Sequence, residues 1–502
     1  ESIVQQIDRT IKTQLNLIPP EPYYIIQITE NFMNNVGEAI YKNSNAFSKV
    51  FEANLTNRID DALKRQNRNR SLTVDLMYVL FGKIAYFIHF ERAYPIKRNN
   101  IDEIVNLYNR EYGYSLETED VIRIAKLSKI LSDTEESSES FRFRNKSVLA
   151  YFVAKEIISQ YNDTGDTTAL NDIINKACIN ICTDILLFII YLTDKTVILN
   201  SILQYIEDSI HSDASWCEFS IPNNIPSFLN NRSFPLFQEK SVNKRIEKKQ
   251  IEKEEEKTEK SMVTSFKIRD IYDWDDNQID NVNGRLFRMT SLLQIVSKCL
   301  PCFEHRLKRS EKEKLIDCLY TLPNQIFMFW SHMVEENYDS IIAELKTHPY
   351  FTNEKPKLSD NEIDSKAKGL FAVFSINLLL NLYYIPVLNA SGKNTFQFLC
   401  GTDFFDHTRK ITYKLEHLMF LEQNHESLDF INNSINVQKE ANDIISKYLL
   451  QCIVRHGLIT REDSLADVNK LESKFYPQKR VSGIDKKKSL LIERTKNKYS
   501  RK

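Results

Sequence analysis

The sequence predicts a mainly α-helical protein with one small winged-helix domain. Three observations lead to this fold class. Glycine contributes only 10 of 502 residues, and a chain so poor in glycine has few of the tight turns that β-rich folds require. Apolar residues recur at helical spacing along most of the chain. A short stretch at residues 141–144 alternates apolar and polar side chains, as a strand does.

Residues 1–66 are predicted to form a small helical domain. Three prolines within residues 19–22 remove backbone donors and end any helix that arrives from upstream. An apolar helix is expected to follow, because its apolar residues recur every three or four positions: Tyr24, Ile25, Ile28 and Phe32.

Residues 67–160 are predicted to form the winged-helix domain. Leu72–Phe90 is long and apolar enough for a buried helix. Asn100 is expected to cap the second helix and Gly113 to close it. A third helix is marked by apolar residues at helical spacing, namely Ile124, Leu127 and Leu131. A polar turn then leads into the strand at Phe141, and three helices closed by a turn and a strand are typical of a winged helix.

Helical patterns continue to the C-terminal region, interrupted by a charge run. That run holds eight Lys or Arg and seven Glu, so it nearly cancels its own charge and is taken as a domain boundary. The predicted segments are a small helical domain (1–66), a winged-helix domain (67–160), a helical segment (161–238), a charged linker (239–262), a C-terminal helical, sensor-like domain (263–473) and a basic tail (474–502).

Composition and charge exclude several classes of protein. The formal net charge of −1 argues against a global basic field for nucleic acid. The most apolar window, Gly369–Leu388, is interrupted by Asn377, Asn381 and Pro386, so we interpret it as a buried core helix and expect no membrane partner. Eight cysteines without a dense framework favour a reducing, cytoplasmic location.

Motifs for catalysis and metal binding are missing from the sequence. It contains no GxxxxGKS/T phosphate loop, no GxGxxG and no GxSxG. Cys299, Cys302 and His305 lie close in sequence, but a zinc site needs four ligands and no second pair completes this one. The same ligand count argues against a metal at His407 and His417. We therefore expect no catalytic residue and no metal site in this chain.

The segment Phe143–Ala154, FRNKSVLAYFVA, resembles the end of the winged-helix domain in STAND-type NTPases, which include the NACHT proteins. The family pattern is approximately F-x-H-x-S-F-x-E-Y-F-x-A. Asn145 stands where the family often has histidine, and Ala150 where it often has glutamate. Tyr151–Lys155, YFVAK, looks most like bacterial antiviral members that also lack the histidine. Residues 18–26 resemble the proline segment that opens the small helical domain after the nucleotide-binding core, and Pro22 is the best match.

This resemblance implies a nucleotide held between a P-loop domain, the small helical domain and the winged helix. Pro22 would pack on the adenine. Asn145 would donate a hydrogen bond to the β-phosphate, with Arg144 or Arg142 adding positive charge. ATP or ADP with Mg²⁺ would be bound mostly upstream of Glu1, in the parent protein. An alternative is that Asn145 only caps the helix that follows it.

The function implied by the resemblance is the regulatory and sensor portion of a STAND NTPase, without hydrolysis by this chain alone. The C-terminal helices would sense a protein ligand, the parent would oligomerise on activation, and a bacterial member would act in antiviral defence. One alternative is a non-enzymatic α-helical scaffold or protein-interaction module. A weaker alternative is nucleic-acid binding by the winged helix and the basic tail. It needs a basic recognition helix, and Val121–Leu131 offers only Arg123, Lys126 and Lys129.

Overall fold

The protein is mainly α-helical, which confirms the mainly α class that the sequence predicts. The computed structural model describes residues 45–66, 72–134, 139–193, 196–211, 282–303, 306–347, 359–390, 411–423, 427–441, 446–447 and 449–454. Pro22, the charged linker and the basic tail lie outside the described residues, and the domain boundaries stay predictions. The chain divides into two compact units. The first holds the described residues up to 209 together with helix α15, and the second holds those from 308 onward.

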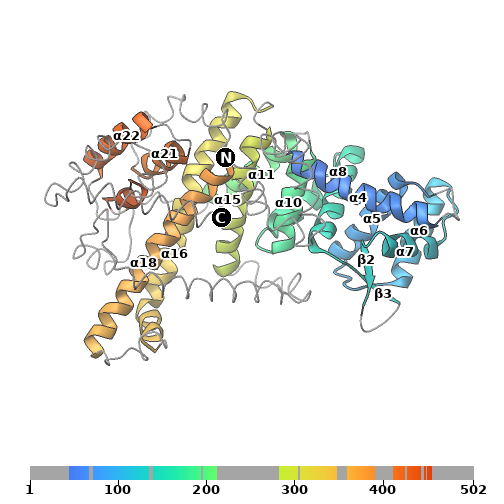
Figure 1. The fold of residues 1–502 in the computed structure, drawn as a ribbon, viewed down its shortest axis with the longest axis horizontal. Helices are drawn as coiled ribbons and strands as arrows, with labels where there is room; N and C mark the ends of the chain where they lie inside the picture. Colours follow the sequence, from blue (N-terminus) through green and yellow to red (C-terminus); the bar gives the residue numbers. More distant parts are fainter. Residues whose placement is uncertain are drawn as a thin grey trace, which may run out of the picture. The chain divides into compact units, whose positions relative to one another are not determined.

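The first unit contains a small α/β segment. In chain order it consists of α5 (Val74–Phe90), β1 (Ile96–Lys97), α6 (Arg98–Tyr112), α7 (Thr118–Leu127), β2 (Leu131–Asp133) and β3 (Ser140–Phe143). The strands form an antiparallel sheet in the order β1-β3-β2, with Ile96 opposite Phe141 and Leu131 opposite Phe143. Figure 1 shows β2 and β3 as a hairpin close to α7. The strand predicted at Phe141 is confirmed.

The helix ends of this segment follow local chemistry, with two corrections to the sequence-based predictions. Gly113 closes α6 in the left-handed conformation at φ 72°, as predicted. Asn100 is not the N-cap, because the chain passes directly from β1 into α6 and Lys97 takes the cap position. Leu131 does not belong to the third helix, because Lys129 adopts a left-handed φ of 56° after α7 and Leu131 begins β2.

Helix α8 (Lys146–Thr164) is the central helix of the first unit. It packs against α5 and α10 (Asn180–Leu192), and every side chain from Ser147 to Ala154 is buried. A helix that is buried all round requires neighbours on every side. Tyr151 supplies part of this core, because its ring lies 5.3 Å from that of Phe51 and 5.6 Å from that of Phe188.

Four further helices complete the first unit: α4 (Asn45–Gln66), α9 (Thr168–Asn175), α11 (Thr196–His211) and α15 (Val282–Phe303). Helix α4 contacts α5, α7 and α10. Helix α15 packs against α10. The Arg288 side chain of α15 also donates to the Tyr205 hydroxyl of α11 at 3.2 Å.

The second unit is built from long helices, α16 (Arg309–Thr347), α18 (Asp360–Ala390), α21 (Ile411–Gln423) and α22 (Ser427–Glu440). Helices α16 and α18 lie side by side (Figure 1) and run antiparallel, because Lys346 pairs with Asp364 while Tyr383 donates to Asn324. In the described part of the chain, α18 alone is long and apolar enough to cross a membrane by length and composition. Half of its most apolar window is buried, so the buried core helix stays a prediction.

Candidate functional site

The candidate residues of the predicted winged-helix segment lie where β3 passes into α8. Alternation along the strand places Phe141 and Phe143 in the core and Arg142 on the other face. Arg142 and Asn145 are half-buried, and Arg144 is exposed. Arg144 and Asn145 therefore come from one short turn at the N-terminus of a helix, and Arg142 comes from the strand just before it. The helix N-terminus and the two guanidinium groups favour a negatively charged ligand.

Backbone hydrogen bonds hold this turn in place. The Arg144 N–H donates to the Ile130 carbonyl at 2.9 Å, which joins the turn to the chain just before β2. The Asn145 carbonyl accepts from the N–H groups of Val148 and Leu149 at 3.1 and 3.2 Å. Asn145 occupies the N-cap position with extended dihedrals, but its side chain makes no capping hydrogen bond. Helix capping therefore does not account for the asparagine side chain.

Tyr94 is a neighbour of the turn that the sequence analysis missed. Its hydroxyl lies 3.4 Å from the Phe143 carbonyl oxygen. Burial raises the pKa of Tyr94 to about 12, and the positive charge of Arg142 opposes that rise. The tyrosine is therefore a neutral hydrogen-bond donor at physiological pH. No periodic pattern in the sequence marks it, because its role depends on the pairing of β1 with β3.

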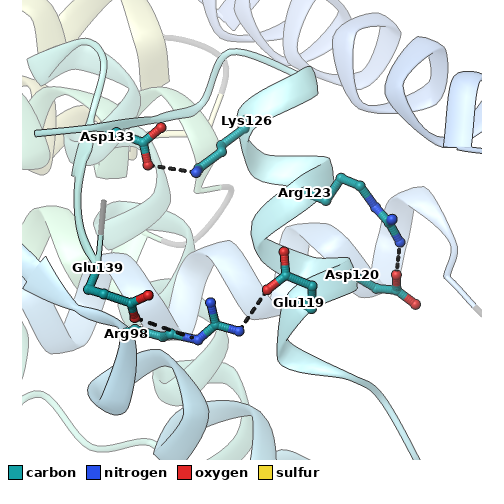
Figure 2. A network of polar contacts seen from close by, with 7 residues as sticks. All are labelled: Arg98, Glu119, Asp120, Arg123, Lys126, Asp133 and Glu139. Carbon is teal, nitrogen blue, oxygen red and sulfur yellow. Dashed lines mark hydrogen bonds and ion pairs between the residues drawn. The ribbon is translucent and has the colours of Figure 1, made fainter. Parts of the chain in front are cut away.

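Two of the three cations predicted for the third helix, Arg123 and Lys126, are paired with carboxylates (Figure 2). Arg123 pairs with Asp120 one turn earlier on the same helix. The Lys126 ammonium lies 2.6 Å from Asp133 and 5.1 Å from the centre of the Phe141 ring. Figure 2 also shows Arg98 between Glu119 at 2.6 Å and Glu139 at 3.8 Å. Because these cations pair with carboxylates, they attract phosphate less strongly than the cations of a nucleic-acid recognition helix do.

Arg58 joins α4 to the end of α7. Its guanidinium donates to the Ser128 carbonyl at 2.8 Å and to the Lys129 carbonyl at 2.5 Å. These carbonyls belong to the C-terminal end of a helix, where a cation is favourable. Because Ile130 in turn accepts from Arg144, a chain of contacts runs from α4 through residues 128–130 to the candidate turn.

A separate cavity of about 460 Å³ lies further along α8. Tyr78, Tyr108 and Tyr112 line it together with the pair Lys83 and Glu156, whose ammonium and carboxylate atoms lie 3.7 Å apart. The candidate residues of the β3–α8 turn do not line this cavity. Among the residues that the structure describes, no group of three or more His, Cys, Asp or Glu side chains gathers in a way that could hold a metal ion.

The comparison with family models covers the same segment. Residues 94–153 match the family described as Novel STAND NTPase 4. The match begins beside β1 and ends within α8, so it includes Arg142, Arg144 and Asn145. It supports a STAND NTPase family, in agreement with the resemblance that begins at Phe143. No curated protein and no solved structure matches the chain.

Proposed function

We propose that this chain is the regulatory and sensor portion of a STAND NTPase. The family match over residues 94–153 is the observation that carries the proposal. The helix–strand–helix–helix–strand–strand order and the β1-β3-β2 sheet support a winged-helix domain in this segment. In this proposal the domain closes over a nucleotide that is held mostly by the parent's P-loop domain.

The β3–α8 turn supplies the contacts to the nucleotide. Asn145 donates one hydrogen bond to the β-phosphate, while Arg144 and Arg142 add positive charge. The exposed position of Arg144 at the N-terminus of α8 supports its assignment. A hydrogen bond to a charged oxygen contributes about 1.5–3 kcal/mol, which is enough to favour a closed, diphosphate-bound state. Pro22 would pack on the adenine, and ATP or ADP would bring Mg²⁺.

The C-terminal helices are the proposed sensor for a protein ligand. Leu370 and Phe374 of α18 are large apolar side chains, yet they are 47% and 56% exposed. Exposed apolar side chains of this size are typical of protein contact surfaces. Ligand binding there would bias a two-state switch toward an oligomeric, active form. A NACHT-like role in antiviral defence and a cytoplasmic location belong to the same proposal.

The gene region upstream of Glu1 tests the proposal directly. It should encode a GxxxxGKS/T motif after a strand pattern, within one or two domain lengths of roughly 100–200 residues each. A gene without a P-loop in that region would contradict the nucleotide role of Asn145. The exposed Leu370 and Phe374 would then favour the second candidate function, a non-enzymatic helical protein-interaction module.

A further inference from the structure

We propose that Asp184 is a positioning residue for the candidate turn, because it anchors Lys146 at the start of α8. This inference rests on the proposed function, in which the turn faces a phosphate. Lys146 is the first residue of α8 and directly follows Asn145. Its ammonium nitrogen lies 2.8 Å from the Asp184 carboxylate of α10. The side chain of Asp184 is 6% exposed, so this anchor lies inside the first unit.

The position of Lys146 has no local explanation. A positive charge in the first turn of a helix opposes the helix dipole, and acidic residues are favoured there instead. The first turn of α8 contains no acidic residue that could compensate locally. The compensating carboxylate comes from Asp184, 38 positions further along the chain. The ion pair therefore ties the N-terminus of α8 to one place on α10.

The surroundings of the Asp184 carboxylate on α10 also disfavour a charge. Every side chain from Ile181 to Tyr191 is buried, and Asp184 is the one charged residue among them. Desolvation raises the pKa of Asp184, against the attraction of Lys146 and, more weakly, of Lys298. An apolar residue would avoid this desolvation cost. An apolar residue, however, could not form the ion pair with Lys146 that holds the turn in place.

The same carboxylate connects the turn to α15. Lys298 of α15 is partly buried, and the negative charge of Asp184 acts against the desolvation that lowers its pKa. Helix α15 packs against α10 in this unit. Displacement of α15 would therefore change the electrostatic surroundings of Asp184 and, through Lys146, the turn that carries Asn145.

Native-state hydrogen exchange of the full chain, without nucleotide, tests the positioning role. Three amides report on the turn, those of Arg144, Val148 and Leu149, because each donates a hydrogen bond that depends on its geometry. Asp184→Asn removes the charge at constant shape. We expect exchange at these three amides to accelerate at least about tenfold relative to other amides of the first unit, since breaking a buried ion pair is strongly destabilising where it acts.

Glu156→Gln is the matched control. Glu156 is also buried and paired with a lysine, and it lies on α8, but 11 residues beyond Asn145, which is about 16 Å along a helix. In Glu156→Gln, hydrogen exchange at the three reporter amides should change no more than exchange at the other amides of the first unit. Asp184→Glu should restore much of the protection, because it restores the charge.

Lys146→Met extends the test to the other member of the ion pair, whose side chain is 31% exposed. It should accelerate the same three amides, and the double variant with Asp184→Asn should add little to either single variant. Uniform acceleration across the unit in Asp184→Asn, or additive effects in the double variant, would overturn the positioning role. Since no nucleotide is present, either result is independent of whether Asn145 contacts a phosphate.

Discussion

Substitution of Arg58 by methionine tests the contact between α4 and the end of α7. Methionine retains an unbranched apolar stem but cannot donate to the carbonyls of Ser128 and Lys129. Loss of the guanidinium group should have two structural effects. The end of α7 loses the cation that satisfies its carbonyls, and α4 loses its polar tie to the chain that leads into β2.

The magnitude follows from the surroundings of each hydrogen bond. The bond to Ser128 is partly buried, so its loss costs about 2 kcal/mol, within the range for charged donors. The bond to Lys129 is exposed, and water replaces it at a cost of well under about 1 kcal/mol. We therefore expect the free energy of unfolding of the first unit to fall by about 2–3 kcal/mol.

Urea unfolding, followed by circular dichroism and by exchange of the α7 amides, provides the assay. Arg65→Met is the matched control, because Arg65 lies on the same helix and is exposed. It should change the free energy of unfolding by less than about 0.5 kcal/mol. Equal midpoints for the two variants, with equal slopes, would refute the role assigned to Arg58.

Two further predictions concern the stability of the first unit. Burial lowers the pKa of His89 to about 4 from an ordinary value of 6.5, so the folded state favours the neutral ring. The neutral ring's contribution to the free energy of unfolding is complete above pH 6.5. It is lost as the pH falls toward 4, by up to about 3 kcal/mol. His89→Gln should weaken the pH dependence of the urea-unfolding midpoint over this window, and an unchanged pH dependence would contradict the assignment. Gly113→Ala should cost about 1 kcal/mol, because φ is +72° and the new methyl group would contact nothing within 4 Å; thermal unfolding measures it, and a neutral result would show that the turn relaxes.

Local features of the fold were predictable from the sequence because local chemistry specifies them. The apolar run at 72–90 became α5, and Gly113 ended α6 because glycine adopts a left-handed φ at little cost. The strand at Phe141 followed from alternation alone. Asn100 and Leu131 were misplaced because competing local features, the direct passage from β1 into α6 and the left-handed residue after α7, moved the helix ends.

The candidate site was predictable only in part. The family-like string located Asn145 and its flanking arginines in one turn, since they are neighbours in the sequence. The anchors of that turn were not predictable. Arg58 and Ser128 are 70 positions apart, and the ion pair between Lys146 and Asp184 likewise joins distant segments. Such contacts depend on how helices pack, and a single sequence carries no periodic signal for them.

The central claim is that Asn145 contacts the nucleotide, and ADP affinity tests it most directly. Titration calorimetry would compare the full-length gene product, which we propose to include a P-loop domain, with its Asn145→Ala variant. Asn162→Ala is the control, because Asn162 is an exposed asparagine on the same helix. Loss of one hydrogen bond to a charged phosphate predicts an approximately tenfold or greater rise in the dissociation constant for Asn145→Ala and no change for Asn162→Ala. Equal ADP affinities for both variants and the parent would contradict the account.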